Sequence, residues 1–516
     1  MVQAHKSWRQ ALAVYLDRRS LTMLGLGFFA GLPLFLVFSS LSLWLSEAGI
    51  KRSEITMFSL AALAYSFKFI WAPLIDNLPL PFLTRTLGRR RAWLLTAQVC
   101  IILAICAMAL TDPAQSGMAI VMALAAIALG FSSATQDIVI DAYRIEIAEG
   151  DLAMQPVFSS TYVAGYRLGM IVSGAGALFL ADYFGSSKES YAYGAWQSAY
   201  LIMAAVMAAG VVLTLGIREP RHSVQTSRAA GDNLRLLFLF AAMVAAFVAV
   251  FVLGGKFLPA TKDALYGFLR ETLRFAVAAM AAALAAWALV KSRRVPVALV
   301  QETWVEPLAD FFRRYGKPAL LLLALIGFFR VSDVVAGVVS NLFYEHLGFS
   351  KSDIAAAVKT FGVIASIIGG FAGGILAQRF DLMRMMMIAA ILASGTNVLF
   401  SLMEWTGAYR MTVGEIPVML YGVVGFDNLA AGFAGAVFVA FLSALTSIRF
   451  TAVQYAIFSS LMTLFPKLLG AYSGRMVDAL GGYPAFFLMT AALGIPILLL
   501  VWLNDRVIFR KQDSGE

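Results

Sequence analysis

Fourteen stretches of about 20 mostly apolar residues limit the fold of this chain more than any other feature. A helix needs about this length to cross the hydrocarbon core of a bilayer, where the backbone must satisfy its own hydrogen bonds. We therefore predict fourteen membrane-spanning helices. Their bounds are 21–45, 55–76, 92–110, 117–142, 157–183, 195–216, 234–253, 274–291, 318–345, 354–378, 384–403, 417–446, 451–478 and 483–504.

The composition indicates a protein that lies almost entirely in the membrane. Of its 516 residues, 60% are hydrophobic and only 14% are charged, whereas soluble domains contain about a quarter charged residues. The longest polar stretches, 218–234 and 291–318, are too short for a soluble domain. The polar lead 1–20 precedes an apolar run too long for a signal peptide, so we expect the first span to stay as an uncleaved anchor.

The net charge of +10 does not indicate a nucleic-acid partner, because the cations lie in loops beside the apolar stretches, where they orient a multi-pass protein. In the fourteen-span model these cation-rich loops all fall on one side. The loops 111–116, 181–195 and 403–415 fall on the other side and carry few cations. By the positive-inside rule, we expect both termini to be cytoplasmic. The cation-rich segments are 6–19, 85–91, 218–235, 291–317, 379–384 and 506–511.

The two halves of the chain repeat each other at an offset of about 300 residues. Phe158-Ser159-Ser160 recurs as Phe458-Ser459-Ser460, and Arg167 aligns with Lys467. Without the spans 234–253 and 274–291, six spans remain on each side, which is the size of a six-helix bundle. We predict an all-α protein with bundles at 1–220 and 318–516, joined by a linker at 221–317 that carries a lipid-facing hairpin. Parallel halves in so apolar a chain predict a transporter with its substrate path between them.

Several charged and polar residues lie inside the predicted spans. A charge at this depth costs at least about 2.5 kcal/mol, so such residues usually face a cavity or one another. Asp137, Asp141 and Arg144 are spaced i, i+4, i+7 and share one helix face. We expect all these residues to line a common cavity. The others are Lys68, Arg167, Arg330, Asp333, Lys359, Asp427, Asn428, Gln454 and Lys467.

Acids surrounded by cations in a membrane suit proton coupling, because burial raises a carboxyl pKa while a neighbouring cation lowers it. The candidates for proton coupling are Asp137, Asp141, Asp333 and Asp427. The deep cations outnumber these acids, which favours an anionic or carboxylate-bearing substrate. For each single residue, a structural salt bridge between helices is the alternative.

No enzyme chemistry is expected. Cys100 and Cys106 lie in one apolar run, which indicates buried thiols and neither a disulfide framework nor a zinc site. A membrane enzyme acting on lipid-linked sugars needs a nucleophile, a metal site or an acid–base set, and none of the three histidines is deep in a span. We expect no catalytic residue, cofactor or metal.

Prolines and glycines predict the local shape of the helices. Gly31-Leu32-Pro33 and Phe465-Pro466 interrupt continuous spans, so bends or freed carbonyls are expected there. A glycine series in the second half would let helices approach closely. It comprises Gly369, Gly370, Gly373, Gly374, Gly422, Gly425, Gly432 and Gly435.

Asp76 followed by Gly88-Arg89-Arg90-Arg91 resembles the signature loop of the major facilitator superfamily, and Gln378-Arg379 is a degenerate second copy. In such a loop the acid accepts hydrogen bonds in one state and loses them in the other. We expect a gating role, with a folding anchor as the alternative. The gating candidates are Asp76, Arg89, Arg90, Arg91, Arg144 and Arg379.

Longer runs resemble the AmpG-type muropeptide permeases of Gram-negative bacteria. They are Gly27 to Pro33, Phe67 to Asp76, Gly88 to Leu95, Ser133 to Ala142 and Gly165 to Met170, with looser matches at Lys359-Thr360, Asn428-Leu429 and 452–455. The resemblance covers 20–220 and, more loosely, 318–500. This chain carries its extra spans between the bundles, whereas some members of that family carry extra spans at the C-terminus.

The resemblance implies a proton-driven importer in the inner membrane. Its family carries N-acetylglucosamine-1,6-anhydro-N-acetylmuramyl peptides to the cytoplasm for cell-wall recycling, which feeds β-lactamase induction. The substrate's carboxylates would meet Lys68, Arg167, Arg330, Lys359 and Lys467. Its sugar hydroxyls would meet Trp71, Gln136, Tyr166, Asn341, Asn428 and Gln454.

Three alternatives stay open. The chain could carry another bulky anion, such as acetyl-CoA or a siderophore; it could bind a muropeptide without moving it, as a sensor or scaffold; or it could be a membrane enzyme. The expected partners are the muropeptide, protons and membrane lipid, and a monomer is usual for this architecture.

Overall fold

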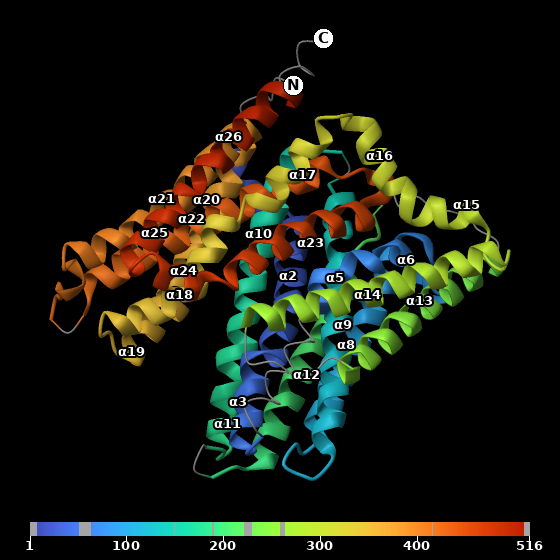
Figure 1. Cartoon of the computed structure of the whole chain (residues 1–516), viewed down its shortest axis with the longest axis horizontal. Helices are drawn as coiled ribbons and strands as arrows, with labels where there is room; N and C mark the ends of the chain where they lie inside the picture. Colours follow the sequence, from blue (N-terminus) through green and yellow to red (C-terminus); the bar gives the residue numbers. More distant parts are fainter. Residues whose placement is uncertain are drawn as a thin grey trace. The chain divides into compact units, whose positions relative to one another are not determined.

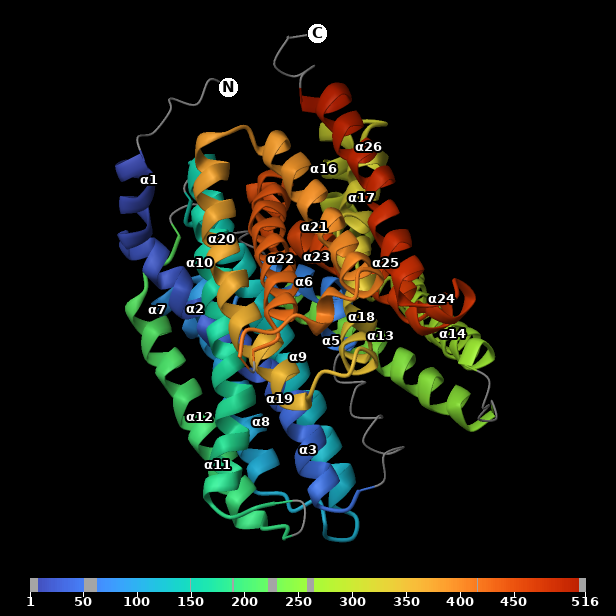
Figure 2. The same cartoon turned by 90° about the vertical axis from the view of Figure 1, so that its left-hand side faces the viewer.

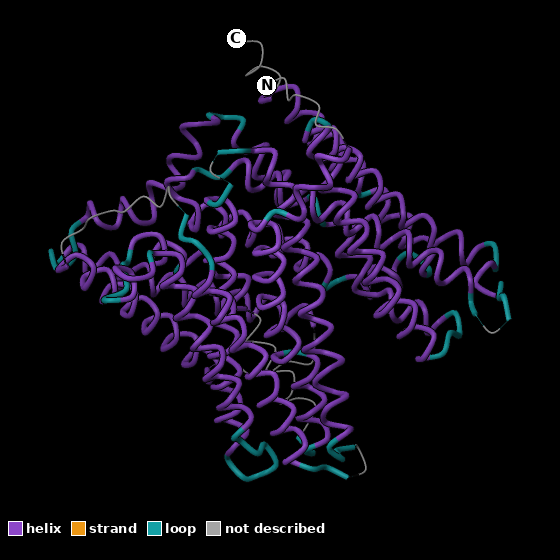
Figure 3. Tube along the Cα trace, turned by 180° about the vertical axis from the view of Figure 1, so that it is seen from behind, coloured by secondary structure: helices purple, strands orange, loops and turns teal. Residues whose placement is uncertain are grey.

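The computed structural model describes residues 8–50, 63–148, 150–187, 190–220, 230–257, 264–414 and 416–509. Helices make up nearly all of this part of the chain, as the purple tube in Figure 3 shows. Thirteen helical stretches in the described ranges are long and apolar enough to span a membrane. Each agrees with a predicted span to within five residues at either end. The fourteenth prediction, 55–76, falls partly on residues 55–62, which lie outside the described residues.

The first half of the chain forms a helical bundle. Its helices pack as neighbours, α10 on α2, α8 on α9 and α12, and α2 on α9 and α12 (Figure 1). Short helices α1 (Trp8–Ala13), η1 (Val14–Leu16), α7 (Leu83–Leu87) and η4 (Leu152–Met154) lie outside the spans. The described spans of this half are α2 (Arg18–Val37) with α3 (Ser39–Glu47), α5 (Leu63–Phe67) with η3 (Lys68–Ile70), α8 (Arg89–Ala109), α9 (Met118–Glu146), α10 (Gln155–Ile171) with η5 (Val172–Gly176) and α11 (Ala177–Tyr183), and α12 (Tyr193–Gly216).

Glycines bring α2 and α10 into backbone contact. A Cβ placed on Gly27 would lie 2.2 Å from the carbonyl oxygen of Tyr162, and one on Gly165 would lie 2.0 Å from that of Leu24. Gly31 and Gly169 make equally close approaches one turn further along. Small residues at such spacing let two membrane helices pack backbone to backbone.

Pro33 does not end α2, which continues to Val37 and breaks only at Phe38. A proline lacks the N–H that would bond the carbonyl four residues earlier. That carbonyl belongs to Phe29, and the buried side-chain amide of Gln136 donates to it at 2.9 Å. The predicted freed carbonyl is therefore present, and α9 supplies its hydrogen bond.

The second half forms a bundle of the same kind, in which α20 and α22 pack side by side (Figure 2). The predicted close approach is confirmed at Gly432, where a Cβ would lie 1.9 Å from the Ser366 carbonyl oxygen, and at Gly369 and Gly373 against Leu429 and Phe433. Its helices are α17 (Ala319–Phe328) with α18 (Val331–His346), α19 (Lys351–Ile354) with η7 (Ala355–Phe361) and α20 (Gly362–Arg379), α21 (Leu382–Trp405), η8 (Ala408–Arg410), α22 (Val418–Leu445), η9 (Ile448–Phe450) with α23 (Thr451–Gly470) and α24 (Ser473–Ala479), and α25 (Tyr483–Ala492) with α26 (Gly494–Asn504) and η10 (Asp505–Phe509).

The internal repeat is visible in the helices themselves. In the first half, a π-helical turn, η5, separates α10 from α11 at residues 172–176. In the second half, α23 ends at Gly470 and α24 begins at Ser473, 300 residues after Ser173. Equivalent spans are thus interrupted at equivalent positions.

A second compact unit comprises residues 70–79 and 224–314. Its helices α13 and α14 form an antiparallel pair that packs through Phe247, Phe251 and Phe275. The predicted domain boundaries at 220 and 317 stay a prediction. The elements of this unit are α6 (Ala72–Asn77), α13 (Ala230–Phe257), α14 (Ala264–Lys291), α15 (Val297–Val300), η6 (Gln301–Val305) and most of α16 (Glu306–Tyr315).

Candidate functional site

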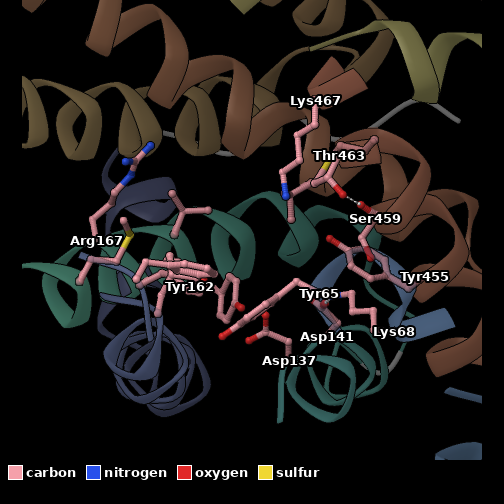
Figure 4. Close-up of a pocket in the computed structure, with 17 residues that line it drawn as sticks. Tyr65, Lys68, Asp137, Asp141, Tyr162, Arg167, Tyr455, Ser459, Thr463 and Lys467 are labelled. Atoms are coloured by element: carbon pink, nitrogen blue, oxygen red, sulfur yellow. Dashed lines mark hydrogen bonds and ion pairs between the residues drawn. The ribbon is translucent and has the colours of Figure 1, made fainter. Parts of the chain in front are cut away.

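A cavity of about 430 Å³ lies between the two halves of the chain. Both halves contribute to it, α2, α5, η3, α9 and α10 from the first and α22 and α23 from the second (Figure 4). Its wall combines charged, hydroxyl and apolar side chains. The lining residues are Leu34, Phe38, Tyr65, Lys68, Asp137, Asp141, Tyr162, Val163, Tyr166, Arg167, Met170, Val439, Tyr455, Ser459, Met462, Thr463 and Lys467.

Asp141 holds two cations in one wall of the cavity. Its Oδ2 lies 3.2 Å from the Lys68 ammonium, and its Oδ1 lies 3.3 Å from the Arg144 guanidinium. All three side chains are at least nine-tenths buried. Arg144 also donates to the Ser159 hydroxyl at 3.2 Å. Because the three side chains are buried, removing one of them would leave an uncompensated charge, which destabilises a protein.

Asp137 lies one helical turn before Asp141 and faces the same cavity, as helical spacing predicts (Figure 4). Only 7% of the residue is exposed, and its Oδ1 has no hydrogen-bond partner in the described part of the chain. Buried carboxylate oxygens are nearly always bonded. This oxygen can therefore accept a further hydrogen bond.

Arg167 and Lys467 reach the cavity from opposite halves. The Lys467 side chain extends from α23 toward the labelled hydroxyl groups, and Arg167 lies at the other end of the view (Figure 4). Neither makes a salt bridge with any residue that the structure describes. These two cations differ in this respect from Lys68 and Arg144, which both pair with Asp141.

Tyr166 was predicted and lines the cavity, but the other hydroxyl side chains of the wall were missed by sequence reasoning. On α23, Tyr455, Ser459 and Thr463 precede Lys467 at intervals of four residues, so all four share one helix face. This polar stripe in an apolar span was the signal that could have found them. Tyr65 and Tyr162 gave no comparable signal, because tyrosines in apolar runs are common in helix packing. The Tyr65 hydroxyl donates to Ser133 at 2.7 Å.

Other predicted residues form a second charged cluster outside the lining of this cavity. Arg330 pairs with Asp333 at 2.5 Å, across a break between α17 and α18. Asp427 accepts a hydrogen bond from Thr396 at 3.0 Å. The charges of Arg330 and Asp333 also act on Asp427. The predicted roles of these residues stay predictions.

Three predicted amide side chains are bonded to the backbone. Besides Gln136, Asn428 donates to the Val424 carbonyl at 3.0 Å, and Gln454 accepts from the Ser447 N–H at 2.8 Å. Asn341 and Lys359 are exposed and do not line the cavity. Trp71 and Asp76 are buried in the 70–79 segment of the second unit.

A buried ion pair of the first half is hydrogen-bonded to the second half at the cation-rich end of the helices. The Arg90 guanidinium lies 2.5 Å from the Glu146 carboxylate, and both side chains are fully buried. Thr451, the first residue of α23, donates to Glu146 at 2.6 Å and accepts from Arg90 at 2.7 Å. Arg89 lies 3.6 Å from the same carboxylate. Sequence reasoning named the arginines and missed Glu146 and Thr451.

Further contacts close the same end. The Tyr15 hydroxyl lies 3.0 Å from that of Ser160, and a Cβ on Gly374 would lie 2.4 Å from both oxygens. Tyr15 also packs against Phe371 of α20. The half-buried Arg379 ends the same helix. The two halves are thus in contact through Tyr15, Ser160, Phe371 and Gly374 as well as through Thr451.

Glu219 holds the beginning of α8 in place. Its carboxylate accepts the backbone N–H groups of Arg90 at 2.8 Å and Arg91 at 3.0 Å. Burial raises the pKa of the Glu219 carboxyl, although these two N–H groups oppose the shift. Arg91 in turn donates to the carbonyls of Thr214 and Leu215. The arginine triplet is therefore anchored to the end of α12.

Comparisons with known proteins agree with this architecture. A family model described as the Major Facilitator Superfamily matches residues 23–425. The anhydromuropeptide permease of Escherichia coli (strain K12) is 31% identical over 493 residues, which cover 95% of this chain and 81% of that protein. Putative transporter AmpG 4 of Rickettsia felis is 29% identical over 495 residues, which cover 96% of this chain and 98% of the relative.

Solved structures show the same fold. The transporter FucP in the outward conformation matches with a TM-score of 0.60 and 11% identity, covering 95% of this chain and 99% of that one. The proton:xylose symporter XylE matches with a TM-score of 0.59 and 14% identity, covering 95% and 96%. The predicted arrangement of two six-helix bundles with extra helices between them is confirmed at the level of the fold.

Proposed function

The chain belongs to the Major Facilitator Superfamily and, within it, to the AmpG-type permeases, and from this premise we propose that it imports anhydro-muropeptides together with protons. It is a multi-pass membrane transporter and not an enzyme. In this proposal the substrate is a GlcNAc-1,6-anhydroMurNAc peptide, which moves from periplasm to cytoplasm across the bacterial inner membrane for peptidoglycan recycling. Both termini are cytoplasmic, and the protein works as a monomer.

The charge of the cavity carries this proposal. The lining contains three cations, Lys68, Arg167 and Lys467, and two acids, Asp137 and Asp141, a net charge of +1 when both acids are ionised. Arg144, which pairs with Asp141 but does not line the cavity, raises the net charge of the whole group to +2. Arg167 and Lys467, which make no salt bridge with a described residue, account for this excess. Carboxylates of a substrate would neutralise this positive charge. The hydroxyl side chains of the lining could form hydrogen bonds with the hydroxyl groups of a sugar.

The same charges supply a physical reason for symport. A proton on Asp137 would raise the net charge of the cavity, so it would strengthen the attraction for an anion. By thermodynamic linkage, a bound anion would favour the proton equally. Proton and cargo would then enter together.

Arg144 offers a route from this site to the contacts between the halves. Its guanidinium bonds Asp141 and lies 4.9 Å from the centre of the Tyr455 ring, on α23 of the second half. Thr451, one turn earlier on α23, belongs to the group of Arg90 and Glu146. We call the group of Arg90, Glu146 and Thr451 the gate. A change of charge at Asp141 would act through Arg144 on α23, the helix that carries Thr451, and alternating access requires such a link between the site and the gate.

Uptake by proteoliposomes tests the proposal. Purified protein is reconstituted, and accumulation of a labelled anhydro-muropeptide is followed with and without an imposed pH gradient. We expect accumulation to need the gradient and to be lost in Asp137→Asn, with Asp151→Asn as a control, because Asp151 lies in an exposed loop.

Other results would select the alternatives. Uptake of acetyl-CoA or of a siderophore in place of the muropeptide would indicate another bulky anion as substrate. Binding of the muropeptide at equilibrium without uptake would indicate a sensor. Accumulation that ignores the pH gradient would contradict proton coupling.

A further inference from the structure

The segment 297–315 is a short helix outside the spans, with two apolar faces. It is built from α15, η6 and α16, which follow one another without a break. One face is buried and includes Leu299, Thr303 and Phe311, at spacings of four and eight residues. It packs against α6, where Trp304 donates from its indole N–H to the Ile70 carbonyl at 3.2 Å. The inner face of this helix is therefore occupied.

The other apolar face is exposed. Val297, Val305, Leu308 and Phe312 are between 37% and 54% exposed. Their spacings of eight, three and four residues place them along one side of the helix. Glu302 and Arg313 lie outside this stripe. The inner face of the helix is in contact with the protein, so the exposed apolar stripe needs another apolar surface to contact.

The segment joins two consecutive membrane spans. The span α14 ends at Lys291, and the span α17 begins at Ala319, so both ends of the segment are tied to the membrane surface on the same side. The Lys291 ammonium lies 4.6 Å from the centre of the Trp287 ring, and the tryptophan is exposed. Tryptophan beside lysine at the end of a span is typical of the interface between lipid and water.

The charges around the stripe match an anionic surface. Residues 291–317 contain six cations and three acids, a net charge of +3. Arg313 and Arg314 are paired with Glu306 and Asp310. Arg293 and Arg294 at one end make no salt bridge with a described residue, and Lys317 at the other end is exposed. Cations that flank an apolar stripe are the pattern of a helix that lies on anionic lipid.

We propose that residues 297–315 form a membrane-surface helix that inserts its outer stripe among the lipids of the cytoplasmic leaflet and binds anionic headgroups through Arg293, Arg294 and Lys317. Each such cation strengthens binding to an anionic leaflet about fivefold at physiological salt. This proposal does not depend on the identity of the transported substrate.

A fluorescent label in proteoliposomes tests it. After replacement of Cys100 and Cys106 by serine, an NBD fluorophore is attached at Phe312→Cys or, as a matched control on the polar side of the same helix, at Glu302→Cys. The vesicles contain phosphatidylcholine alone or a mixture with phosphatidylglycerol. Quenching by lipids that carry a spin label near the headgroup is compared with quenching by aqueous iodide.

We expect lipid quenching at F312C to exceed that at E302C by about twofold or more, and to increase with phosphatidylglycerol. The triple variant R293Q/R294Q/K317Q should lose the dependence on phosphatidylglycerol, with thermal stability unchanged because all three side chains are exposed. Equal access of iodide to both labels would overturn the insertion. A dependence on phosphatidylglycerol that survives in the triple variant would overturn the assignment of the headgroup site.

Discussion

Arg167 and Lys467 stand 300 residues apart, at equivalent positions of the internal repeat, and line the same cavity from opposite halves of the chain. Each is carried by the equivalent span of its half, α10 or α23, and neither makes a salt bridge with a described residue. Each half of the repeat thus contributes to the cavity one cation that has no salt bridge with a described residue.

Replacing Lys467 by alanine should weaken binding of a muropeptide with free carboxylates about 10- to 100-fold, the value of one charge-assisted hydrogen bond. An amidated muropeptide should lose much less. Titration of the purified protein by calorimetry measures both affinities, and Lys256→Ala, an exposed lysine at the end of α13, is the control. Equal losses for the amidated and the free-acid substrate would refute the charge pairing.

Lys68→Met should lower stability by about 3 to 5 kcal/mol, because it leaves one buried carboxylate without a compensating charge. The double variant K68M/D137N restores the balance of one acid and one cation around Asp141, so it should recover much of this loss. Thermal unfolding of the purified protein measures the difference. A double variant that is as unstable as K68M would show that charge balance is not what holds the site together.

Thr451→Val removes the two hydrogen bonds that Thr451 makes to the first half and keeps the Arg90–Glu146 pair. The loss of about 1 to 3 kcal/mol should shift the population toward opening of the cation-rich end. Spin labels at Asp151→Cys and Arg449→Cys, both exposed on opposite halves, report the change as longer distances.

The control for this opening is Thr446→Val, since the Thr446 hydroxyl bonds only within α22, to the Leu442 carbonyl, in the described structure. It should leave the distance distribution unchanged. Identical distributions in T451V and T446V would remove Thr451 from the gate.

Gly165→Ala should reduce the yield of folded protein and lower its melting temperature, because the new methyl group would meet the Leu24 carbonyl at 2.0 Å. The obstacle is backbone, so overpacking of about 1 to 3 kcal/mol or more is expected. Gly194→Ala in α12 should be neutral or slightly stabilising, because the new methyl group would have no described atom within 4 Å apart from its chain neighbours and its own helix backbone. Equal melting temperatures for the two variants would contradict the contact between α2 and α10.

Gln136→Met should cost about 1 to 3 kcal/mol of stability, because it leaves the Phe29 carbonyl buried without a donor. In a Pro33→Ala background the residue at position 33 supplies its own N–H to that carbonyl, so the same change should cost much less. The four melting temperatures form a double-mutant cycle. Additive losses would show that Pro33 and Gln136 are not coupled.

Much of this architecture follows from the sequence, because a bilayer allows a chain few choices. A run of 20 apolar residues must form a helix in lipid, and thirteen predicted spans agree with the structure. The i, i+4 spacing placed Asp137 and Asp141 on one face, and both line the cavity. The 300-residue offset predicted that Arg167 and Lys467 would be equivalent.

The ion pairs and hydrogen bonds between helices could not be predicted from the sequence in the same way. Nothing in the local sequence distinguishes Asp141, which pairs with two cations, from Asp137, one of whose carboxylate oxygens has no hydrogen-bond partner among the described residues. Glu146 looks like an ordinary charge at a helix end until α23 brings Thr451 to it. The sequence suggests that Gln136 faces the cavity, but its side-chain amide donates to the Phe29 carbonyl, which Pro33 leaves without its usual N–H donor.

Hydrogen bonds within a helix join residues four apart, so length, face and depth in the membrane can be derived from the sequence of each span alone. Which faces meet depends on how each helix is rotated and shifted against its neighbours. The backbone contacts of Gly27 and Gly165, or of Gly369 and Gly432, set that rotation, and they join residues far apart in the chain. Folding of the whole chain therefore decided which of these charges form ion pairs, Lys68 with Asp141 in the cavity and Arg90 with Glu146 at the cation-rich end.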